Sequence, residues 1–274
     1  MTWPFLVTAH ASLRVTYMSG GGHHVEPREA DMDARSSRLI PDRIGLTLSL
    51  VLFGVPALVL WLATAVVLPA LVARGWEPLS AWFLAGMLAL GPLLAAALAG
   101  AWTALPDASF PAILRHLRVQ RLSAKDWRAA GLALAVTIPA MGALQLFNAL
   151  VWPRLPPHPT FITVQALEPG RYYLFALWLP FFAVNIVGEE LWWRGFVQPR
   201  QEPVFGAGTW AVQGLLHGAF HFSFGPGVMF ILWPVLFSIP CAVQRTRNTS
   251  VGMLIHAGVN GPAFLAVTLG LFPA

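Results

Sequence analysis

The sequence predicts an all-α integral membrane protein, a polytopic bundle of about seven transmembrane helices. Of its 274 residues, 57% are hydrophobic and only 11% are charged, whereas a soluble domain carries about 25% charged residues. The mean hydropathy is positive, at +0.64. With so few charges the chain has too little polar surface to face water, so lipid is the expected solvent for most of it.

The first 43 residues differ from the rest of the chain. They combine glycines, histidines and charges of both signs without apolar periodicity. Segments of this composition do not bury enough apolar surface to fold alone. The apolar stretch at residues 3–7 is short and has no basic residues before it, so we expect no signal peptide. A disordered tail is therefore predicted for residues 1–43.

Seven apolar segments follow the tail, at residues 44–70, 79–104, 129–152, 172–198, 207–222, 227–243 and 251–272. Each is predicted to be helical, because the edge of an open sheet finds no hydrogen-bond partners in lipid. Prolines and glycines separate several of them, as at Gly225-Pro226-Gly227. The fifth segment is short for a full span, so we expect it to be tilted, broken or buried within the bundle.

Basic residues in the loops predict an orientation. They precede the first span and gather between the second and third and between the sixth and seventh spans, as Arg35, Arg38, Arg43, Arg115, Arg118, Arg121, Lys125, Arg128, Arg245 and Arg247. The loops at 71–78 and 153–171 carry fewer of them. The positive-inside rule then places the N-terminus in the cytoplasm and the C-terminus outside a cell inner (plasma) membrane.

Two further expectations come from the placement of charge. Residues 109–128 set apolar positions such as Phe110 and Ile113 against basic ones, which predicts an amphipathic helix at the cytoplasmic interface. The net charge of +5 does not indicate nucleic-acid binding, because no basic stripe is interleaved with aromatic residues. The lipid bilayer is the expected partner.

A glutamate pair lies at the end of the fourth apolar segment, in the run Glu189-Glu190-Leu191-Trp192-Trp193-Arg194-Gly195. An ionisable side chain at membrane depth costs at least ~2.5 kcal/mol, so it indicates function by default. Glu190 and Arg194 are four residues apart and can pair. Glu189 projects about 100° away on the helix and lacks that partner, so it is a candidate general base. The alternative is that both glutamates simply mark the cytoplasmic end of a helix.

Two other polar pairs have the same i, i+4 spacing, which puts the members of each pair on one helix face. His217 and His221 lie in the fifth segment, and they are candidates for metal ligands with a carboxylate or for a proton-handling pair. A lone buried histidine is more often a satisfied core residue. His256 and Asn260 open the last span, where their donors suit an oxyanion hole; hydrogen bonding between helices is the alternative.

Together these groups resemble the motifs of the CPBP family, the CAAX proteases and bacteriocin-processing enzymes that are also called the Abi family. The run from Glu189 to Gly195 is similar to the family's Glu-Glu-x-x-x-Arg motif. Residues 214–221 resemble its Phe-x-x-x-His motif, and residues 256–260 resemble its His-x-x-x-Asn motif. The resemblance covers about residues 172–272, a CPBP-like catalytic core that follows the N-terminal transmembrane helices of residues 44–171.

The resemblance implies a helical bundle whose polar cavity opens toward the cytoplasmic leaflet. Glu189 and His221 would activate a water for attack on a peptide carbonyl, and His256 and Asn260 would stabilise the oxyanion. This scheme needs no metal and no other cofactor. The implied substrate is a membrane-associated protein or peptide, and the resemblance does not require it to be prenylated.

The second motif departs from the family pattern. Aligned on His221, the motif phenylalanine is replaced by His217; aligned on His217, it is replaced by Gln213. The first alignment is preferred, because Phe220-His221-Phe222 before a Gly-Pro turn is similar to bacterial members. It gives His221 the catalytic role, leaves His217 without one, and predicts that His217→Phe is tolerated. Glu190 and Arg194 would hold the geometry.

Two alternatives stay open at this point. A zinc-dependent membrane peptidase would use Glu189, His217 and His221 as ligands. The single cysteine, Cys241, excludes a site built from several thiolates. A non-catalytic member of the family, acting in bacteriocin immunity or as a scaffold, would keep the fold without turnover. The presence of every polar motif residue argues against that second alternative.

Overall fold

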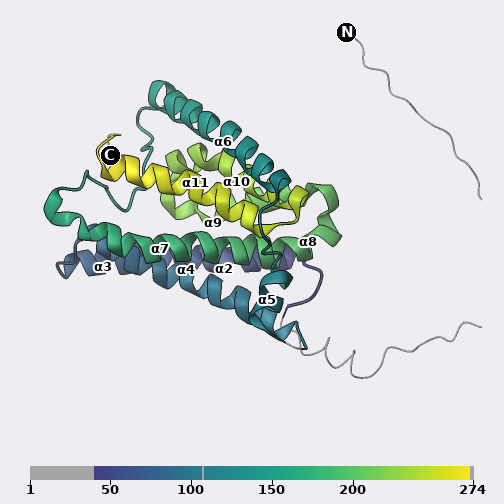
Figure 1. Ribbon diagram of the computed structural model, residues 1–274. Coiled ribbons are helices and arrows are strands. Elements are labelled where there is room, and N and C mark those ends of the chain that lie inside the picture. Colours follow the sequence, from purple (N-terminus) through teal and green to yellow (C-terminus); the bar gives the residue numbers. More distant parts are fainter. Residues whose placement is uncertain (1–39, 107, 272–274) are drawn as a thin grey trace, which may run out of the picture. The chain divides into compact units, whose positions relative to one another are not determined.

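The structure is a computed structural model that describes residues 40–106 and 108–271. The disordered tail predicted for residues 1–43 lies outside the described residues as far as residue 39. Within the described part, the chain forms helices joined by loops and turns, and it has no strand (Figure 1). The predicted all-α fold class is therefore confirmed.

The α-helices are α2 (Leu46–Leu62), α3 (Leu68–Ala73), α4 (Pro78–Thr103), α5 (Phe110–His116), α6 (Ala124–Val151), α7 (Tyr173–Glu190), α8 (Gln198–Phe205), α9 (Thr209–Phe220), α10 (Pro226–Thr246) and α11 (Thr249–Thr268). Two π-helical stretches, η1 (Ala63–Val67) and η3 (Leu191–Val197), connect α2 to α3 and α7 to α8 without a break. Short 3₁₀ turns occupy Pro169–Arg171, Gly206–Gly208 and Phe222–Phe224.

Six helical stretches of the described chain are long and apolar enough to cross a membrane, at Leu46–Ala73, Pro78–Thr103, Ala124–Val151, Tyr173–Phe220, Pro226–Thr246 and Thr249–Thr268. The fourth of these contains two of the seven predicted segments, because α9 continues from α7 through η3 and α8. With 12 residues, α9 extends about 18 Å, whereas a hydrocarbon core is about 30 Å thick. The multi-pass bundle is thus close to the predicted seven spans, with α9 too short to cross alone.

The helices pack in two groups around two hydrophobic cores. In one, α7 lies along α4, and α2 packs against α9; in the other, α10 packs against α6, α9 and α11 (Figure 1). Helix α6 is the least covered span, and Leu132, Val136 and Leu150 on it are each more than half exposed. Apolar side chains in such positions suit a helix that faces lipid.

The segment predicted as one amphipathic helix near residues 109–128 is divided in the structure. Helix α5 covers Phe110–His116, and α6 begins only at Ala124. Two caps explain the division: Ser109 caps α5, and Ser123 forms a capping box with Asp126 at the start of α6. Such a box satisfies the free N–H groups of a new helix and favours a start at that residue.

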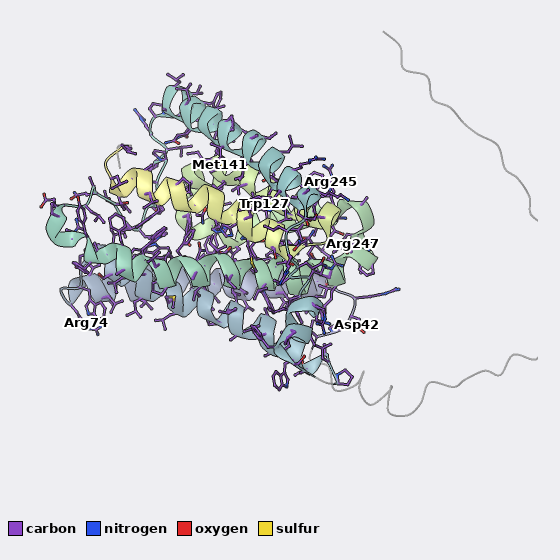
Figure 2. The ribbon with its side chains drawn as sticks, viewed as in Figure 1. Asp42, Arg74, Trp127, Met141, Arg245 and Arg247 are labelled. Atoms are coloured by element: carbon purple, nitrogen blue, oxygen red, sulfur yellow. The ribbon has the colours of Figure 1, made fainter. Side chains whose placement is uncertain are left out.

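Charged residues mark the two ends of the helical bundle. Arg245 and Arg247 lie at the same end of the bundle as Asp42, and Arg74 lies at the opposite end (Figure 2). The side of the membrane on which each end lies stays a prediction.

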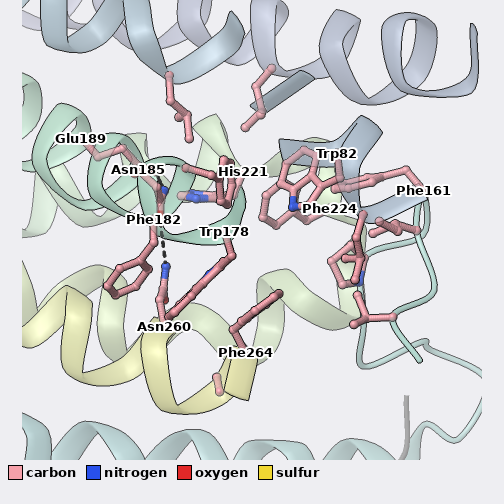
Figure 3. A pocket seen from close by; sticks show the side chains of 18 of the residues that line it. Trp82, Phe161, Trp178, Phe182, Asn185, Glu189, His221, Phe224, Asn260 and Phe264 are labelled. Atoms are coloured by element: carbon pink, nitrogen blue, oxygen red, sulfur yellow. Dashed lines mark hydrogen bonds between the residues drawn. The ribbon is translucent and has the colours of Figure 1, made fainter. Parts of the chain in front are cut away.

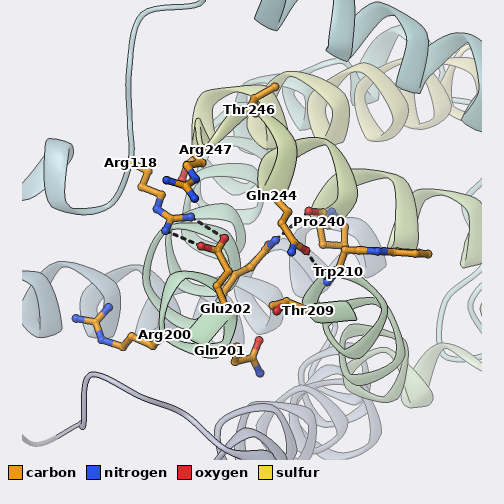
Figure 4. A network of polar contacts seen from close by, with 12 residues as sticks. Arg118, Arg200, Gln201, Glu202, Thr209, Trp210, Pro240, Gln244, Thr246 and Arg247 are labelled. Carbon is orange, nitrogen blue, oxygen red and sulfur yellow. Dashed lines mark hydrogen bonds and ion pairs between the residues drawn. The ribbon is translucent and has the colours of Figure 1, made fainter. Parts of the chain in front are cut away.

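A cluster of buried polar contacts closes this basic end, and we call it the polar belt. Its members are Arg118, Gln198, Gln201, Glu202, Gln213, Asn248 and Thr249. The Arg118 guanidinium donates to both Glu202 oxygens at 2.8 Å (Figure 4). Gln201 donates to Ser49 and accepts from Gln213. The belt therefore joins α8 to α2, α9 and the loop before α6, and it holds the helices that carry the candidate site.

Candidate active site

The three sequence motifs converge in the middle of the bundle. Glu189 and Glu190 end α7, Arg194 lies in η3, His217 and His221 end α9, and His256 and Asn260 lie on α11. Glu190 and Arg194 are fully buried, at 0% exposure, and Glu189, His217 and His256 are buried as well. Residues up to 75 positions apart in sequence are in direct contact here.

The π-helical stretch η3 contains the rest of the first motif. Its Trp193 ring stacks on Phe53, with ring centroids 4.0 Å apart. At Gly195, a Cβ would lie 2.8 Å from the carbonyl oxygen of Leu117. That contact is too close for any other residue, so glycine lets η3 pack directly on the backbone after α5.

Glu189 has two hydrogen-bond partners, which the sequence did not predict. Its Oε1 accepts from Nδ2 of Asn185 at 2.6 Å, and its Oε2 lies 2.8 Å from Nε2 of His217. The sequence predicts only that Glu189 does not pair with Arg194, and no ion pair between these two residues occurs in the described part of the chain. Asn185 lies one turn earlier on α7, and His217 reaches Glu189 from α9.

Glu190 faces the other way and contacts different groups. Its Oε1 lies 3.5 Å from NH1 of Arg194, so the expected i, i+4 ion pair is present. The same oxygen lies 3.0 Å from Nδ1 of His256. A Cβ on Gly252 would collide with Oε2 of Glu190, so glycine at this position of α11 permits the close approach.

The hydrogen-bond partners assign the histidine tautomers. Arginine can only donate, so Nδ1 of His217 accepts from NH2 of Arg194 at 2.9 Å, and its Nε2–H donates to Glu189. Nδ1 of His221 lies 3.0 Å from the backbone oxygen of His217. That oxygen can only accept, so Nδ1 of His221 carries the proton and its Nε2 is basic. His256 donates from Nδ1 to the Glu190 carboxylate.

These contacts close into a ring. Asn260 Nδ2 donates to His256 Nε2 at 3.0 Å and to Oδ1 of Asn185 at 3.3 Å. Asn185 in turn donates to Glu189, which completes the circuit. We call this the polar ring, and its members are Asn185, Glu189, Glu190, Arg194, His217, His256 and Asn260.

Asn185 is the ring member that the sequence analysis missed. It is a polar residue inside the apolar part of α7, one turn before Glu189. Side chains at i and i+4 share a helix face. The same spacing that singled out the other three pairs also relates Asn185 to Glu189, so the signal was present in the sequence.

Comparison with known families agrees with this geometry. Residues 171–261 match the family model described as Rce1-like, type II CAAX prenyl endopeptidase Rce1-like. This part of the chain is therefore similar to the CAAX protease (CPBP) family. No curated protein and no solved structure matches the chain. The matched segment runs from the start of α7 to Gly261 in α11 and contains every residue of the polar ring.

Two cavities lie beside the ring. The larger is about 250 Å³, and its polar lining consists of Asn185, Glu189, His221 and Asn260. Figure 3 shows these four side chains among the aromatic rings that also line the cavity, which are Trp82, Phe161, Trp178, Phe182, Phe224 and Phe264. The larger cavity thus presents its polar groups to an otherwise apolar space.

The second cavity is about 170 Å³ and lies on the other side of His221. Aliphatic residues of α10 line it together with His217, His256 and Asn260. His221 and Asn260 line both cavities.

One group in the described residues has the donor types for a metal ion. Ligand atoms of Glu189, His217 and His221 all lie within 4.8 Å of one another, and two histidines with a glutamate are a known zinc donor set. The Arg194 contact opposes this use. It requires a lone pair on Nδ1 of His217 and hence a proton on Nε2, so the nitrogen that faces Glu189 is not available to a metal.

Proposed function

We propose that the chain is an intramembrane endopeptidase that hydrolyses a peptide bond of a membrane-associated protein or peptide without a metal ion. At the family level it is a CAAX-type intramembrane protease. The observation that carries the finer proposal is the cavity wall on which Glu189, His221 and Asn260 lie together. These three residues supply the base and the oxyanion donor that amide hydrolysis needs.

The reaction begins with a water held between Glu189 and the basic Nε2 of His221. A carboxylate has about four lone-pair positions, so Glu189 can accept from this water besides Asn185 and His217. The water oxygen attacks the carbonyl carbon while one proton passes to the carboxylate or to the imidazole. The tetrahedral intermediate then collapses, the C–N bond breaks, and the leaving amine takes up that proton.

Asn260 is the donor for the oxyanion. Both of its amide hydrogens are engaged, and the bond to Asn185 is the longer one at 3.3 Å. An oxyanion in the cavity attracts that hydrogen more strongly than a neutral amide oxygen does. In the assigned tautomer, Nε2 of His256 accepts from Asn260. His256 therefore orients Asn260 between Glu190 and the substrate and does not donate itself.

The experiment is a comparison of new chain termini in membranes from cells that make the wild type or Glu189→Gln. We expect termini that appear only with the wild type and that lie within or beside apolar segments. Identical sets of termini would exclude peptidase activity and favour a non-catalytic membrane protein.

A zinc-dependent peptidase is the second candidate, and the Glu189, His217 and His221 donor set favours it. Elemental analysis of the purified protein distinguishes the two. Stoichiometric zinc that is lost in His217→Phe would support the metal enzyme and contradict the tautomer assigned from Arg194.

The site is proposed to lie in a cell inner membrane with the N-terminus in the cytoplasm. The basic residues at one end of the bundle support this orientation. A reporter fused ahead of residue 40 should be active only in the cytoplasm, and a periplasmic signal would reverse the topology.

A further inference from the structure

Asn185 occupies a position in the polar ring that none of the three motifs covers. Its side chain lies between Glu189 on the same helix and Asn260 on α11, and it lines the larger cavity (Figure 3). It is thus the only described residue that hydrogen-bonds both to the proposed base and to the proposed oxyanion donor.

Only one orientation of the Asn185 amide fits its surroundings. The Nδ2 group points to a carboxylate oxygen of Glu189, and Oδ1 points to the NH₂ group of Asn260. A flipped amide would put an oxygen against the carboxylate and one NH₂ against another. Both contacts would then be repulsive, because a carboxylate only accepts and an NH₂ group only donates.

The contacts of Glu189 show what this orientation does. His217 holds Oε2 from α9, and Asn185 holds Oε1 from one turn earlier on α7. With a donor on each oxygen, the carboxylate cannot rotate about its terminal torsion without losing a charge-assisted bond, a class roughly twice as strong as neutral bonds. Asn185 also restrains the Asn260 amide until a stronger acceptor enters the cavity.

We infer that Asn185 is a positioning residue that fixes the Glu189 carboxylate and links it to the oxyanion donor Asn260. The inference rests on the proposed function for its effect on catalysis. The positioning itself is a property of the folded protein, and it can be measured without turnover.

The first test measures activity with internally quenched apolar peptides in proteoliposomes. In Asn185→Ala, kcat should fall about 10-fold, the loss of roughly one hydrogen bond to a charged group, while KM stays near the wild-type value. Asn148→Ala is the control, because Asn148 is a buried asparagine that donates to a backbone oxygen outside the ring. It should leave kcat unchanged. An unchanged kcat in Asn185→Ala would overturn the catalytic part of the inference.

A second variant separates positioning from packing. Asn185→Asp keeps the shape and the acceptor for Asn260, but it places a carboxyl group against Glu189. Two carboxyl groups at hydrogen-bond distance share one proton, and a protonated carboxyl donates as the amide does. Its activity relative to the wild type should therefore rise as the pH falls. A relative activity that is flat with pH would indicate that Asn185 only fills space.

The third test needs no substrate. The infrared carboxylate band of Glu189, identified by difference against Glu189→Gln, should shift in Asn185→Ala and stay in place in Asn148→Ala. An unshifted band would refute the positioning role, whatever the activity. If the wild type cleaves no peptide faster than Glu189→Gln does, the peptidase proposal fails, and the band still decides the role of Asn185.

Discussion

The polar ring and the polar belt are built from the same kinds of side chain, and both join helices that are far apart in the sequence. Each contains arginine, glutamate and amide groups linked by short hydrogen bonds, although Arg118 and Glu202 of the belt are only partly buried. They differ in what lies beside them. Five ring members on three helices line the cavities together with His221, whereas no belt member lines either cavity.

The difference shows that burial and polarity alone do not identify an active site. A buried polar network costs desolvation wherever it occurs and is retained when its groups satisfy one another. The belt closes one end of the bundle, although the side-chain oxygens of Gln198 and Gln213 have no hydrogen-bond partner there. The ring is enclosed on its Glu190–Arg194 side, where both residues are fully buried. On its Asn185–Glu189–Asn260 side it faces the larger cavity.

The largest effect on folding should come from the side of the ring that lines neither cavity. Glu190→Ala leaves the buried Arg194 without its carboxylate and His256 without its acceptor. Removing one partner of a buried ion pair costs about 3–5 kcal/mol, so we expect a large loss of folded protein. Size-exclusion yield and thermal unfolding in detergent measure it. Near-normal stability would break the division of the ring into a structural and a catalytic side.

The largest effect on activity should come from the cavity side. Glu189→Gln should lower turnover per folded molecule by at least ~10²-fold, the usual loss for a general base. Its stability should fall less than that of Glu190→Ala. The side-chain oxygen of the new glutamine still accepts from one of the two donors, and only its NH₂ group faces the other donor, either Asn185 or His217. A Glu189→Gln protein that cleaves at the wild-type rate would remove this residue from the mechanism.

Substitutions of the two histidines of α9 should have smaller effects than substitutions of the two glutamates. His221→Ala removes the basic nitrogen on the cavity wall, and turnover should fall by roughly 10²-fold with little change in stability. His217→Phe introduces the phenylalanine of the family motif, so the sequence predicts that this variant keeps its activity. The structure predicts a loss of both stability and activity, because Arg194 and Glu189 each lose a partner. Wild-type activity in His217→Phe would support the sequence-based expectation.

The smallest effect on catalysis should come from the belt. Gln201→Ala removes bonds to Ser49 and Gln213, which should cost about 1–3 kcal/mol of stability. Turnover per folded molecule should match the wild type, as measured by activity titrated against folded protein. A specific loss of turnover would show that the belt and the ring act as one unit.

Much of this arrangement could be predicted from the sequence, because apolar length and i, i+4 spacing are local properties. The helical class, the positions of the spans and the Glu190–Arg194 pair all follow from them. Contacts between helices do not. The His217 bond to Glu189 depends on how α9 docks against α7, and no spacing rule for one helix contains that information.

Two features that local sequence signals could have predicted were also missed. The apolar positions of residues 109–128 suggested one helix, but the Ser123–Asp126 capping box starts a new one. Asn185 was passed over because asparagine carries no charge, although its spacing to Glu189 matched the other pairs.

The π-helical stretch η3 has a consequence for how this protein tolerates insertions and deletions. It connects the ring glutamates to Gln198 and Gln201 through one uninterrupted helix. A helix rotates its side chains by about 100° per residue. Losing one residue within Leu191–Val197 would therefore turn α8 away from its partners while every motif residue remained in the sequence. The geometry of the candidate site therefore depends on the length of this stretch as well as on the identity of its residues.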